Sequence, residues 1–237
     1  MKKTSETFFT EEEKTNIENA IKEAELNTSG EIVAMVVEKS SEYSDADFIM
    51  GIFFAAIISV VPAQIFFYYS DFILRKTIPA MNWVNEVPDS TRFIAGLSFF
   101  IILTMILHIP LKAILGRIPF LKKLFITNKK MNEKVEDKAF RGFYRHGLSK
   151  TKDATGILFF ISIFEKKVYV LADHGIYSKI KQETLNKYAE SVGKGIKSGN
   201  GAEALCKTIK DAGKELAHYF PVQKDDVNEL PDELIVE

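Results

Sequence analysis

The sequence predicts an α/β domain that is interrupted, after its first strand, by a two-helix transmembrane hairpin. Three observations support this fold class. A capped helical pattern over residues 11–25 leads into an apolar, β-branched run at residues 31–37. Two apolar blocks at residues 48–69 and 93–111 contain no Asp, Glu, Lys or Arg. Residues 156–172 supply two further β-rich runs, and strands that alternate with helical patterns are typical of α/β folds.

Composition and length limit the classes of protein to consider. The 237 residues carry a net charge of -1, with 46% hydrophobic and 27% charged residues. A nearly neutral chain without a long basic block gives no reason to expect nucleic acid as a partner. Outside the apolar blocks and the connection between them roughly 170 residues remain, enough for one well-cored domain but scarcely for two. We expect the single cysteine, Cys206, to be a buried helical residue in a reducing compartment.

The N-terminal part is expected to supply one helix and one strand. It begins with a polar stretch rather than with the apolar segment of a signal peptide. Thr10 and Glu13 have the spacing of a capping box, and acids at residues 11–13 favour the positive end of the helix dipole. Residues 27–30, Asn-Thr-Ser-Gly, end the helix before the strand at residues 31–37.

The two apolar blocks are long enough to cross a bilayer. At about 1.5 Å per residue each spans roughly 30 Å, the thickness of the hydrocarbon core. Pro62 is expected to kink the first helix, and Pro110 is expected to mark the end of the second. Trp83, in the connection formed by residues 70–92, and the tyrosine pair at 68–69 are candidates for an interfacial aromatic belt.

The charges that flank the apolar blocks predict their orientation. The connection at residues 70–92 carries three basic residues, whereas six basic residues and no acid follow the second block. Because basic residues favour the cytoplasmic side, and Lys2 and Lys3 lie at the N-terminus, both soluble parts are expected to be cytoplasmic. The basic flank expected near anionic headgroups consists of Arg117, Lys122, Lys123, Lys129 and Lys130.

The C-terminal part is expected to contain the central strand. Residues 131–147 are predicted to form a helix that ends with Gly147 in the left-handed conformation. Residues 156–163 form an apolar run that we expect to be covered on both faces, and residues 168–172 return as the second strand of a tight antiparallel hairpin. Two further helices are predicted at residues 182–196 and 202–219.

These elements indicate one domain that is split by the hairpin. Residues 1–47 and 116–220 form its N-terminal and C-terminal parts, and residues 48–115 form the transmembrane hairpin. An acidic tail, residues 221–237, is expected to contribute no fold element. Neither part alone can bury a core, so the strand at residues 31–37 is expected to add to the sheet of the central strand.

Five short motifs stand at the ends of the predicted elements. They are Thr28-Ser29-Gly30-Glu31-Ile32, Thr155-Gly156-Ile157-Leu158, Glu165-Lys166-Lys167-Val168, Ala172-Asp173-His174-Gly175-Ile176 and Asn228-Glu229-Leu230-Pro231-Asp232. They resemble the TPM domain, and more narrowly the bacterial membrane proteins in which that domain is interrupted by a helical pair. The resemblance implies a three-layer α-β-α sandwich around a small mixed sheet. It implies no settled activity, since members include a protein described as an acid phosphatase, photosystem-repair factors and a receptor accessory protein.

Three carboxylates are candidates for a metal site. Glu31, Asp153 and Asp173 flank predicted strand ends, where α/β folds place ligands, and carboxylate oxygens could hold a hard cation such as Ca²⁺ or Mg²⁺. Some soluble TPM relatives bind divalent cations, which agrees with this hypothesis. Acids at strand ends also cap or solvate loops. No catalytic residue can be assigned: Asp173-His174 could be an acid/base pair, but no Ser or Cys nucleophile has a recognisable context.

Three other motifs have simpler structural explanations. Arg145-His146-Gly147 lacks the second arginine of the histidine-phosphatase motif and is interpreted as a helix C-cap. Gly193-Lys194-Gly195 follows a helix rather than a strand, so it is not a phosphate-binding loop. His108, within the second apolar block, could be a proton or ion site, although a position near the membrane interface also explains it.

We therefore expect an integral protein of the bacterial inner membrane with two spans and a cytoplasmic domain. Its partners would be the lipid bilayer and another membrane protein, for which the domain is an interaction or scaffold module. The alternative is a divalent-cation-dependent, acid-phosphatase-like hydrolase that uses Glu31, Asp153 and Asp173. The two hypotheses differ in whether these carboxylates converge in one cleft.

Overall fold

The chain forms two compact units. The computed structural model describes residues 4–78, 80, 87–222 and 227–237, so Lys2, Lys3, Trp83 and Asn85 lie outside the described residues. One unit contains residues 1–42 and 128–237, and we call it the α/β unit. The other contains residues 43–127, and we call it the hairpin unit. The boundary after the hairpin therefore lies at residue 127 rather than at the predicted residue 115.

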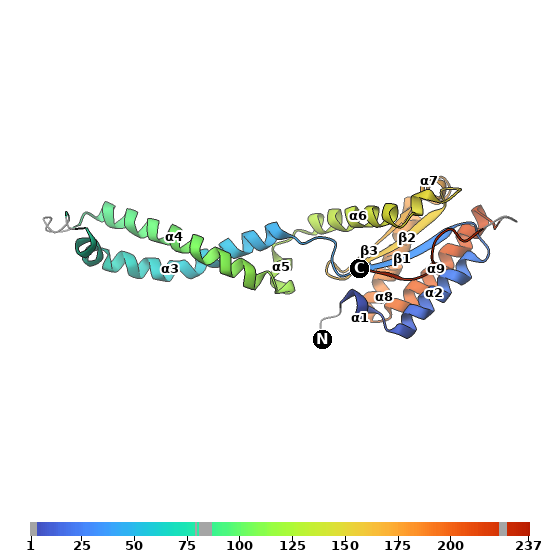
Figure 1. Ribbon diagram of the computed structural model, residues 1–237, viewed down its shortest axis with the longest axis horizontal. Helices are drawn as coiled ribbons and strands as arrows, with labels where there is room; N and C mark the ends of the chain where they lie inside the picture. The colour runs from blue at the N-terminus through green and yellow to red at the C-terminus, as the bar shows by residue number, and fades with distance from the viewer. Residues whose placement is uncertain (1–3, 79, 81–86, 223–226) are drawn as a thin grey trace. The chain divides into compact units, whose positions relative to one another are not determined.

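The α/β unit is built on a four-stranded mixed sheet in the order β3-β2-β1-β4 (Figure 1). Strand β1 pairs in parallel with β2 and β4, whereas β2 and β3 form the predicted antiparallel hairpin. The expected pairing between the N-terminal strand and the central strand is thus present. The bounds of the strands are β1 Glu31–Val37, β2 Gly156–Ser162, β3 Lys167–Ala172 and β4 Ile235–Val236.

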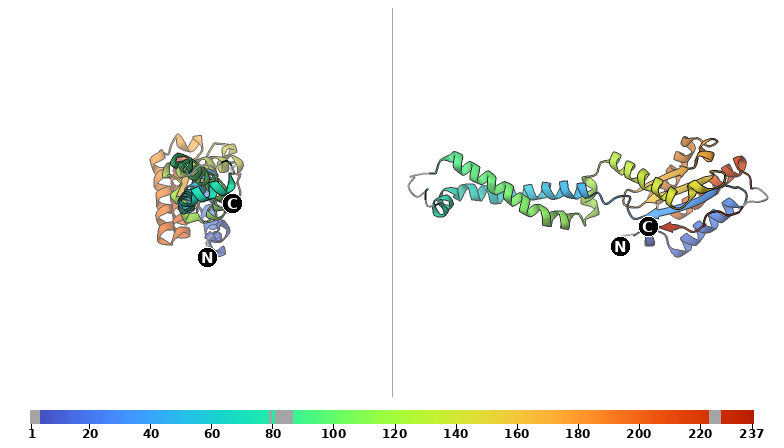
Figure 2. Two further views of the ribbon diagram at one scale, coloured as in Figure 1. Left: turned by 90° about the vertical axis from the view of Figure 1, so that its left-hand side faces the viewer. Right: turned by 45° about the horizontal axis from the view of Figure 1, so that its top comes forward.

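Helices cover both faces of this sheet because β1 and β2 are apolar on both sides. All seven residues of each strand are buried. In β1, Ile32 and Val36 contact the helices of one face, and Val33 and Met35 contact the helix of the other face. Each such side chain contributes roughly 1.5–3 kcal/mol when it is buried. The first face is covered by α2 (Glu11–Glu25), α8 (Gln182–Ser198) and α9 (Gly201–Tyr219), and the second by α6 (Asn128–Arg145), as Figures 1 and 2 show.

The predicted helix ends are confirmed by their hydrogen bonds and dihedral angles. The Thr10 hydroxyl accepts from the Glu13 amide at 3.2 Å, and the Glu13 carboxylate accepts from the Thr10 amide at 2.7 Å. Gly147 follows α6 with a φ of 82°, the left-handed conformation that favours glycine. Three short helical segments complete the unit: α1 (Ser5–Phe8), the 3₁₀ helix η2 (Leu148–Lys150) and α7 (His174–Tyr177).

The prediction of a C-terminal tail outside the fold was wrong for its last residues. Strand β4 extends the sheet beside β1, and the Glu237 amide donates to the Val36 carbonyl at 2.9 Å. The Glu237 carboxylate accepts from Lys138 Nζ at 2.7 Å and from an Arg145 guanidinium nitrogen at 2.6 Å. Two residues of strand are too short to give a recognisable alternation, so this pairing depends on tertiary contacts with β1 and α6.

The described residues of the hairpin unit include two long antiparallel helices and a short third one. They are α3 (Ser44–Thr77), α4 (Asp89–Leu115) and α5 (Pro119–Leu124). Helix α3 continues through Pro62, and α4 continues past Pro110, the predicted end of the second span. The helices approach closely where small residues face large ones, as at Gly51 against His108 and Gly96 against Phe67. The rings of Phe66 and Phe99 stack at a centroid distance of 4.4 Å.

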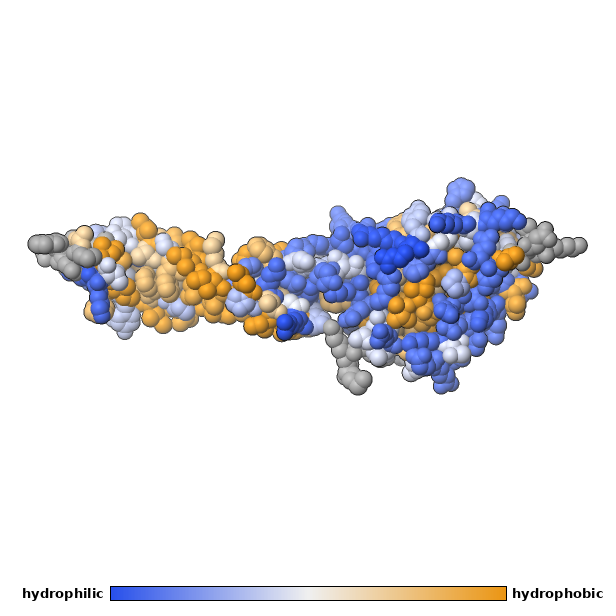
Figure 3. All heavy atoms as spheres, viewed as in Figure 1, coloured by the Kyte–Doolittle hydropathy of each residue, from blue (hydrophilic) through white to orange (hydrophobic). Residues whose placement is uncertain are grey.

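Both α3 and α4 are long and apolar enough to cross a membrane. Their most apolar stretches have a mean hydropathy of 2.2, and only 22% of that stretch in α3 and 6% in α4 is buried. The core helix of a soluble protein would bury most of such a stretch. The outer surface of the hairpin unit is accordingly hydrophobic in Figure 3, whereas much of the α/β unit is hydrophilic.

Candidate functional site

The three predicted metal ligands lie at one edge of the sheet, but this is the amino edge of its parallel strands. Glu31 begins β1 and pairs with Gly156, the first residue of β2. Asp153 lies in the turn before β2, and Asp173 follows the antiparallel strand β3, whose Ala172 pairs with Ile157. Ligands in α/β folds usually bind at the carboxyl edge of parallel strands. The expectation that these strand ends form the usual ligand edge is therefore wrong.

Two of these carboxylates have local structural partners. Glu31 is 6% exposed, and its carboxylate accepts from the amides of Glu229 and Leu230 at 3.2 Å each. The Asp173 carboxylate accepts from the His174 amide at 2.7 Å and so caps α7. Asp153 is exposed. Among the described residues no group of three or more His, Cys, Asp or Glu side chains is placed to hold a metal ion. A cation site at these three residues stays a prediction.

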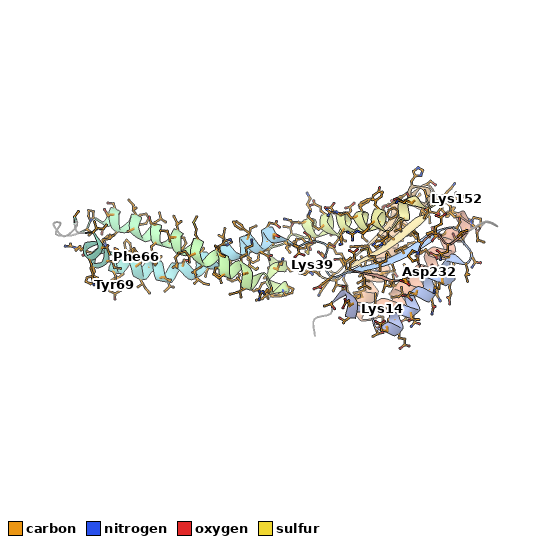
Figure 4. All side chains as sticks on the ribbon, in the orientation of Figure 1. Lys14, Lys39, Phe66, Tyr69, Lys152 and Asp232 are labelled. Carbon is orange, nitrogen blue, oxygen red and sulfur yellow. The ribbon has the colours of Figure 1, made fainter. Side chains whose placement is uncertain are left out.

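A carboxylate pair that the sequence did not reveal lies next to Glu31. Glu25, the last residue of α2, accepts from the Ile32 amide at 2.6 Å and is hydrogen bonded to the side chain of Asp232, which is labelled in Figure 4. The pKa of Glu25 is raised to about 9, mainly by burial and also by the nearby Glu31 and Asp232, while the hydrogen bond from the Ile32 amide acts to lower it. Glu25 is therefore protonated at neutral pH and donates to Asp232.

The C-terminal segment formed by residues 228–232 is what brings these groups together. Its amides bind the Glu31 carboxylate, and its Glu229 carboxylate accepts from the Lys152 amide at 2.9 Å. The Asn228 side-chain amide donates to Asp232 at 2.8 Å. The segment thus connects α2, the start of β1 and the loop before β2. The polar residues of the Asn228–Asp232 motif therefore serve to hydrogen bond this segment across the amino edge of the sheet.

We expect Glu25→Gln to remove a pH dependence of stability. The pKa of Glu25 is 4.5 in the unfolded chain and about 9 in the folded protein, so between these values only the folded state keeps the proton. The contribution of Glu25 to the free energy of unfolding is fully present below about pH 4.5 and is lost as the pH rises toward 9. Glutamine mimics the neutral acid. Urea unfolding in detergent should show equal stability of variant and wild type near pH 5, and a more stable variant at pH 8.

The matched control for this experiment is Glu233→Gln. Glu233 lies one residue after Asp232 and is exposed, so its substitution should leave the pH dependence of the wild type unchanged. A stability difference between Glu25→Gln and the wild type that is the same at pH 5 and pH 8 would contradict the assignment of a proton to Glu25.

The carboxyl edge of the parallel strands holds a second polar cluster, formed by Ser40, Ser162 and Glu165. The Ser40 amide donates to the Glu165 carboxylate at 3.0 Å, and the Ser40 and Ser162 hydroxyls lie 3.0 Å apart. The Ser162 hydroxyl donates to the second carboxylate oxygen of Glu165. Glu165 is only 3% exposed. Its buried carboxylate therefore fastens the chain that leaves β1 to the turn between β2 and β3.

The predicted basic flank is divided by the structure. The Lys122 side chain is buried in the hairpin unit, where its Nζ lies 2.9 Å from an Asp47 carboxylate oxygen. It therefore forms a structural ion pair rather than a headgroup contact. Arg117 and Lys129 are exposed, and Lys129 lies 4.0 Å from Glu133. Lys123 and Lys130 are half-buried and also have partners.

The remaining motifs occupy helix ends or helix interiors. Arg145 is the last residue of α6 and binds Glu237, and His146 follows the helix. Helix α8 continues through Gly193 to Ser198, so the glycines there form no phosphate-binding loop. His108 in α4 contacts the ring of Phe48 edge-on at 4.7 Å, and its buried Nδ1 has no hydrogen-bond partner among the described residues. Cys206 lies in α9, as predicted, but it is half-buried rather than buried.

The fold defines the chain as an α/β protein with a small mixed sheet and two long apolar helices. No family model matches the sequence, and no curated protein matches it. Among solved structures, the chain is similar to the NMR structure of BA42 protein from the psychrophilic bacterium Bizionia argentinensis. The TM-score is 0.53 and the sequence identity 21%, and the match covers 96% of this chain and 94% of that chain. At this identity the similarity shows the fold alone.

Proposed function

We propose that this protein is a membrane-anchored interaction or scaffold module, with a TPM-like domain that faces the cytoplasm. The observation that supports this proposal is the insertion of two long apolar helices, exposed on their outer surface, into a chain that otherwise forms one α/β unit. Such a surface is costly in water and favourable in a bilayer.

Charged side chains at both ends of the hairpin unit support its role as an anchor. At one end Asp47 pairs with Lys122. At the other end Arg75 binds Asp71 at 3.0 Å, and the Arg92 guanidinium donates to the Ser70 hydroxyl at 3.1 Å. The stretch of α3 between these ends, residues 48–69, contains no charged residue. This distribution is typical of helices whose ends lie at the two membrane surfaces.

The TPM-like assignment has two supports. Helices lie on both faces of the small sheet, as a three-layer α-β-α sandwich requires. The motif residues Gly30-Glu31, Thr155-Gly156, Ala172-Asp173 and Asn228–Asp232 lie at the same edge of that sheet and contact one another there. Four of the five motifs, far apart in sequence, thus share one edge of the sheet, whereas Glu165-Lys166-Lys167-Val168 lies at the opposite edge. This clustering favours a common domain over chance similarity.

Alkaline extraction and cysteine labelling test the anchor and its orientation. The protein is expected to stay in the membrane pellet at high pH. In a Cys206→Ser background, a membrane-impermeant reagent should modify Asn85→Cys in intact cells and should modify Asn128→Cys only after the cells are opened. Labelling of Asn128→Cys alone in intact cells would mean that the α/β unit is exported, and release by alkali would remove the anchor.

The alternative function, a divalent-cation-dependent acid-phosphatase-like hydrolase, requires a cation near Glu31, Asp153 and Asp173. Because Glu31 and Asp173 already bind backbone amides, we expect no saturable heat when Ca²⁺ or Mg²⁺ is titrated into the wild type. Saturable heat that Asp173→Ala abolishes would support the hydrolase instead. Glu233→Gln, which changes an exposed acid outside this edge's hydrogen bonds, is the control for nonspecific charge effects.

A further inference from the structure

The outer surface of the hairpin unit carries polar side chains, and Gln64 is one of them. Gln64 lies in α3, is exposed, and makes no hydrogen bond among the described residues. It stands six residues before Ser70, whose hydroxyl is bound by Arg92 at the polar end of the hairpin. At 1.5 Å per residue this places Gln64 about 9 Å from that end along the helix, within the stretch that would lie in hydrocarbon. A carboxamide facing lipid without a partner is costly there.

Gln64 lines a groove between the two long helices. The groove has a volume of about 340 Å³, and its other walls include Val60, Ala63, Phe67 and Gly96. Gly96 is buried against Phe67 within the hairpin, so a second helix would meet the side chains that line the groove, with Ala63 as a small residue next to Gln64. A second groove, on the side that includes Ile65 and the residues Phe66 and Tyr69 labelled in Figure 4, is lined by apolar and aromatic side chains.

We propose that the Gln64 groove is the contact surface between two copies of this chain in the membrane, which pair about a two-fold axis. This inference rests on the proposed membrane anchor. Two copies inserted with the same orientation place Gln64 at the same depth, without any further requirement on the sequence. A carboxamide carries both a donor and an acceptor, so the two Gln64 side chains satisfy each other by reciprocal N–H···O=C hydrogen bonds.

A helix from a different protein fits these observations less well. Such a helix would need a polar group at the depth of Gln64 to satisfy the carboxamide, whereas a second copy supplies that group automatically. Lipid chains could fill the apolar part of the groove but could offer no hydrogen bond to Gln64. The self-complementary carboxamide therefore selects a second copy as the occupant.

Disulfide cross-linking of the purified full-length chain in lipid vesicles tests this proposal. In a Cys206→Ser background, Val60→Cys, one turn from Gln64 on the groove side, should form an intermolecular disulfide on mild oxidation. Ile65→Cys, on the opposite groove, should not. Adding Gln64→Leu to Val60→Cys should weaken dimerisation by roughly tenfold, as expected for the loss of interhelical hydrogen bonds in a membrane. The matched control Ile65→Leu should leave the cross-linking yield unchanged.

Four results would overturn the proposal, and alkaline extraction of the same vesicles shows whether the dimer contact alone fails or the membrane anchor fails as well. Equal cross-linking at Val60→Cys and Ile65→Cys would mean nonspecific association. An unchanged yield with Gln64→Leu would remove Gln64 as the determinant. If extraction-resistant protein forms no cross-link at Val60→Cys, a second copy is excluded and a helix of another protein is indicated. The proposed membrane anchor would not be affected by that result. Protein released by alkali would overturn the anchor, and with it this contact.

Discussion

Deleting residues 1–42 is expected to abolish cooperative folding of the rest of the α/β unit. The deletion removes β1, which lies between β2 and β4 and is buried along its whole length, and α2, which packs on the same core. Burial of the large apolar side chains of β1 contributes roughly 1.5–3 kcal/mol each. Their sum is comparable with the entire stability of a typical domain, about 5–15 kcal/mol. Residues 128–237 alone should therefore show a broad, non-cooperative denaturation profile and a tendency to aggregate.

The complementary experiment keeps both parts of the unit and removes the hairpin. Replacing residues 43–127 with a flexible Gly/Ser linker of about 8 to 20 residues should give a soluble protein that unfolds in one urea transition. Circular dichroism and tyrosine fluorescence should report the same urea midpoint of unfolding. A cooperative transition for residues 128–237 alone, with the same midpoint, would show that residues 1–42 are not part of the unit.

A second large effect is expected at Gly213, where α9 crosses α2. A Cβ atom added there would lie 2.6 Å from the Ala24 Cβ and 2.9 Å from the Ala24 Cα, well inside ordinary contact distance. The backbone of one helix must therefore move, which costs about 1–3 kcal/mol in a packed core and exceeds the gain in helix propensity. Gly213→Ala should lower the urea midpoint of the detergent-solubilised full-length chain.

Gly193→Ala is the matched control, because it makes the same substitution within a helix of the same unit. The nearest atom to the added Cβ would be Val168 Cγ2 at 4.0 Å, so the substitution meets open space. Alanine favours the helix over glycine by up to about 1 kcal/mol, and the midpoint should rise or stay unchanged. If both alanine variants shift the midpoint in the same direction, the close contact between α2 and α9 does not limit stability.

The elements that sequence patterns predicted well are those whose residues repeat a strong local signal. The runs of β1 and β2 are apolar along their length and flanked by turn residues, and the charge-free blocks at residues 48–69 and 93–111 are unambiguous by length. By contrast, β4 has two residues and pairs only because the chain returns to β1. Helix α4 extends through Pro110 to Leu115, beyond the boundary that a proline usually suggests.

The candidate site was predicted less well, because its contacts depend on residues distant in sequence. Glu25 is the last residue of an amphipathic helix, and nothing local indicates that it keeps a proton. The pairing with Asp232 arises only when residues 228–232 reach the start of β1. The one available signal was the density of polar residues in the Asn228–Asp232 motif, which suits a segment that binds backbone amides. Lys122 was likewise predicted to lie near lipid headgroups from its charge alone, because the sequence does not reveal its ion pair with Asp47.

The central position of β1 has a consequence for the biosynthesis of this protein. The ribosome produces β1 first, then both helices of the hairpin and α6, and only afterwards the partner strand β2. At roughly 5–20 residues per second this interval lasts on the order of ten seconds. During that time both edges of the apolar strand β1 are unpaired, while the two helices that we propose as the membrane anchor follow it in the chain. For the proposed anchor, the hairpin is synthesised and available for insertion before the sheet can close, so a defect in insertion is expected to appear in cells as degradation or aggregation of an α/β unit whose own sequence is intact.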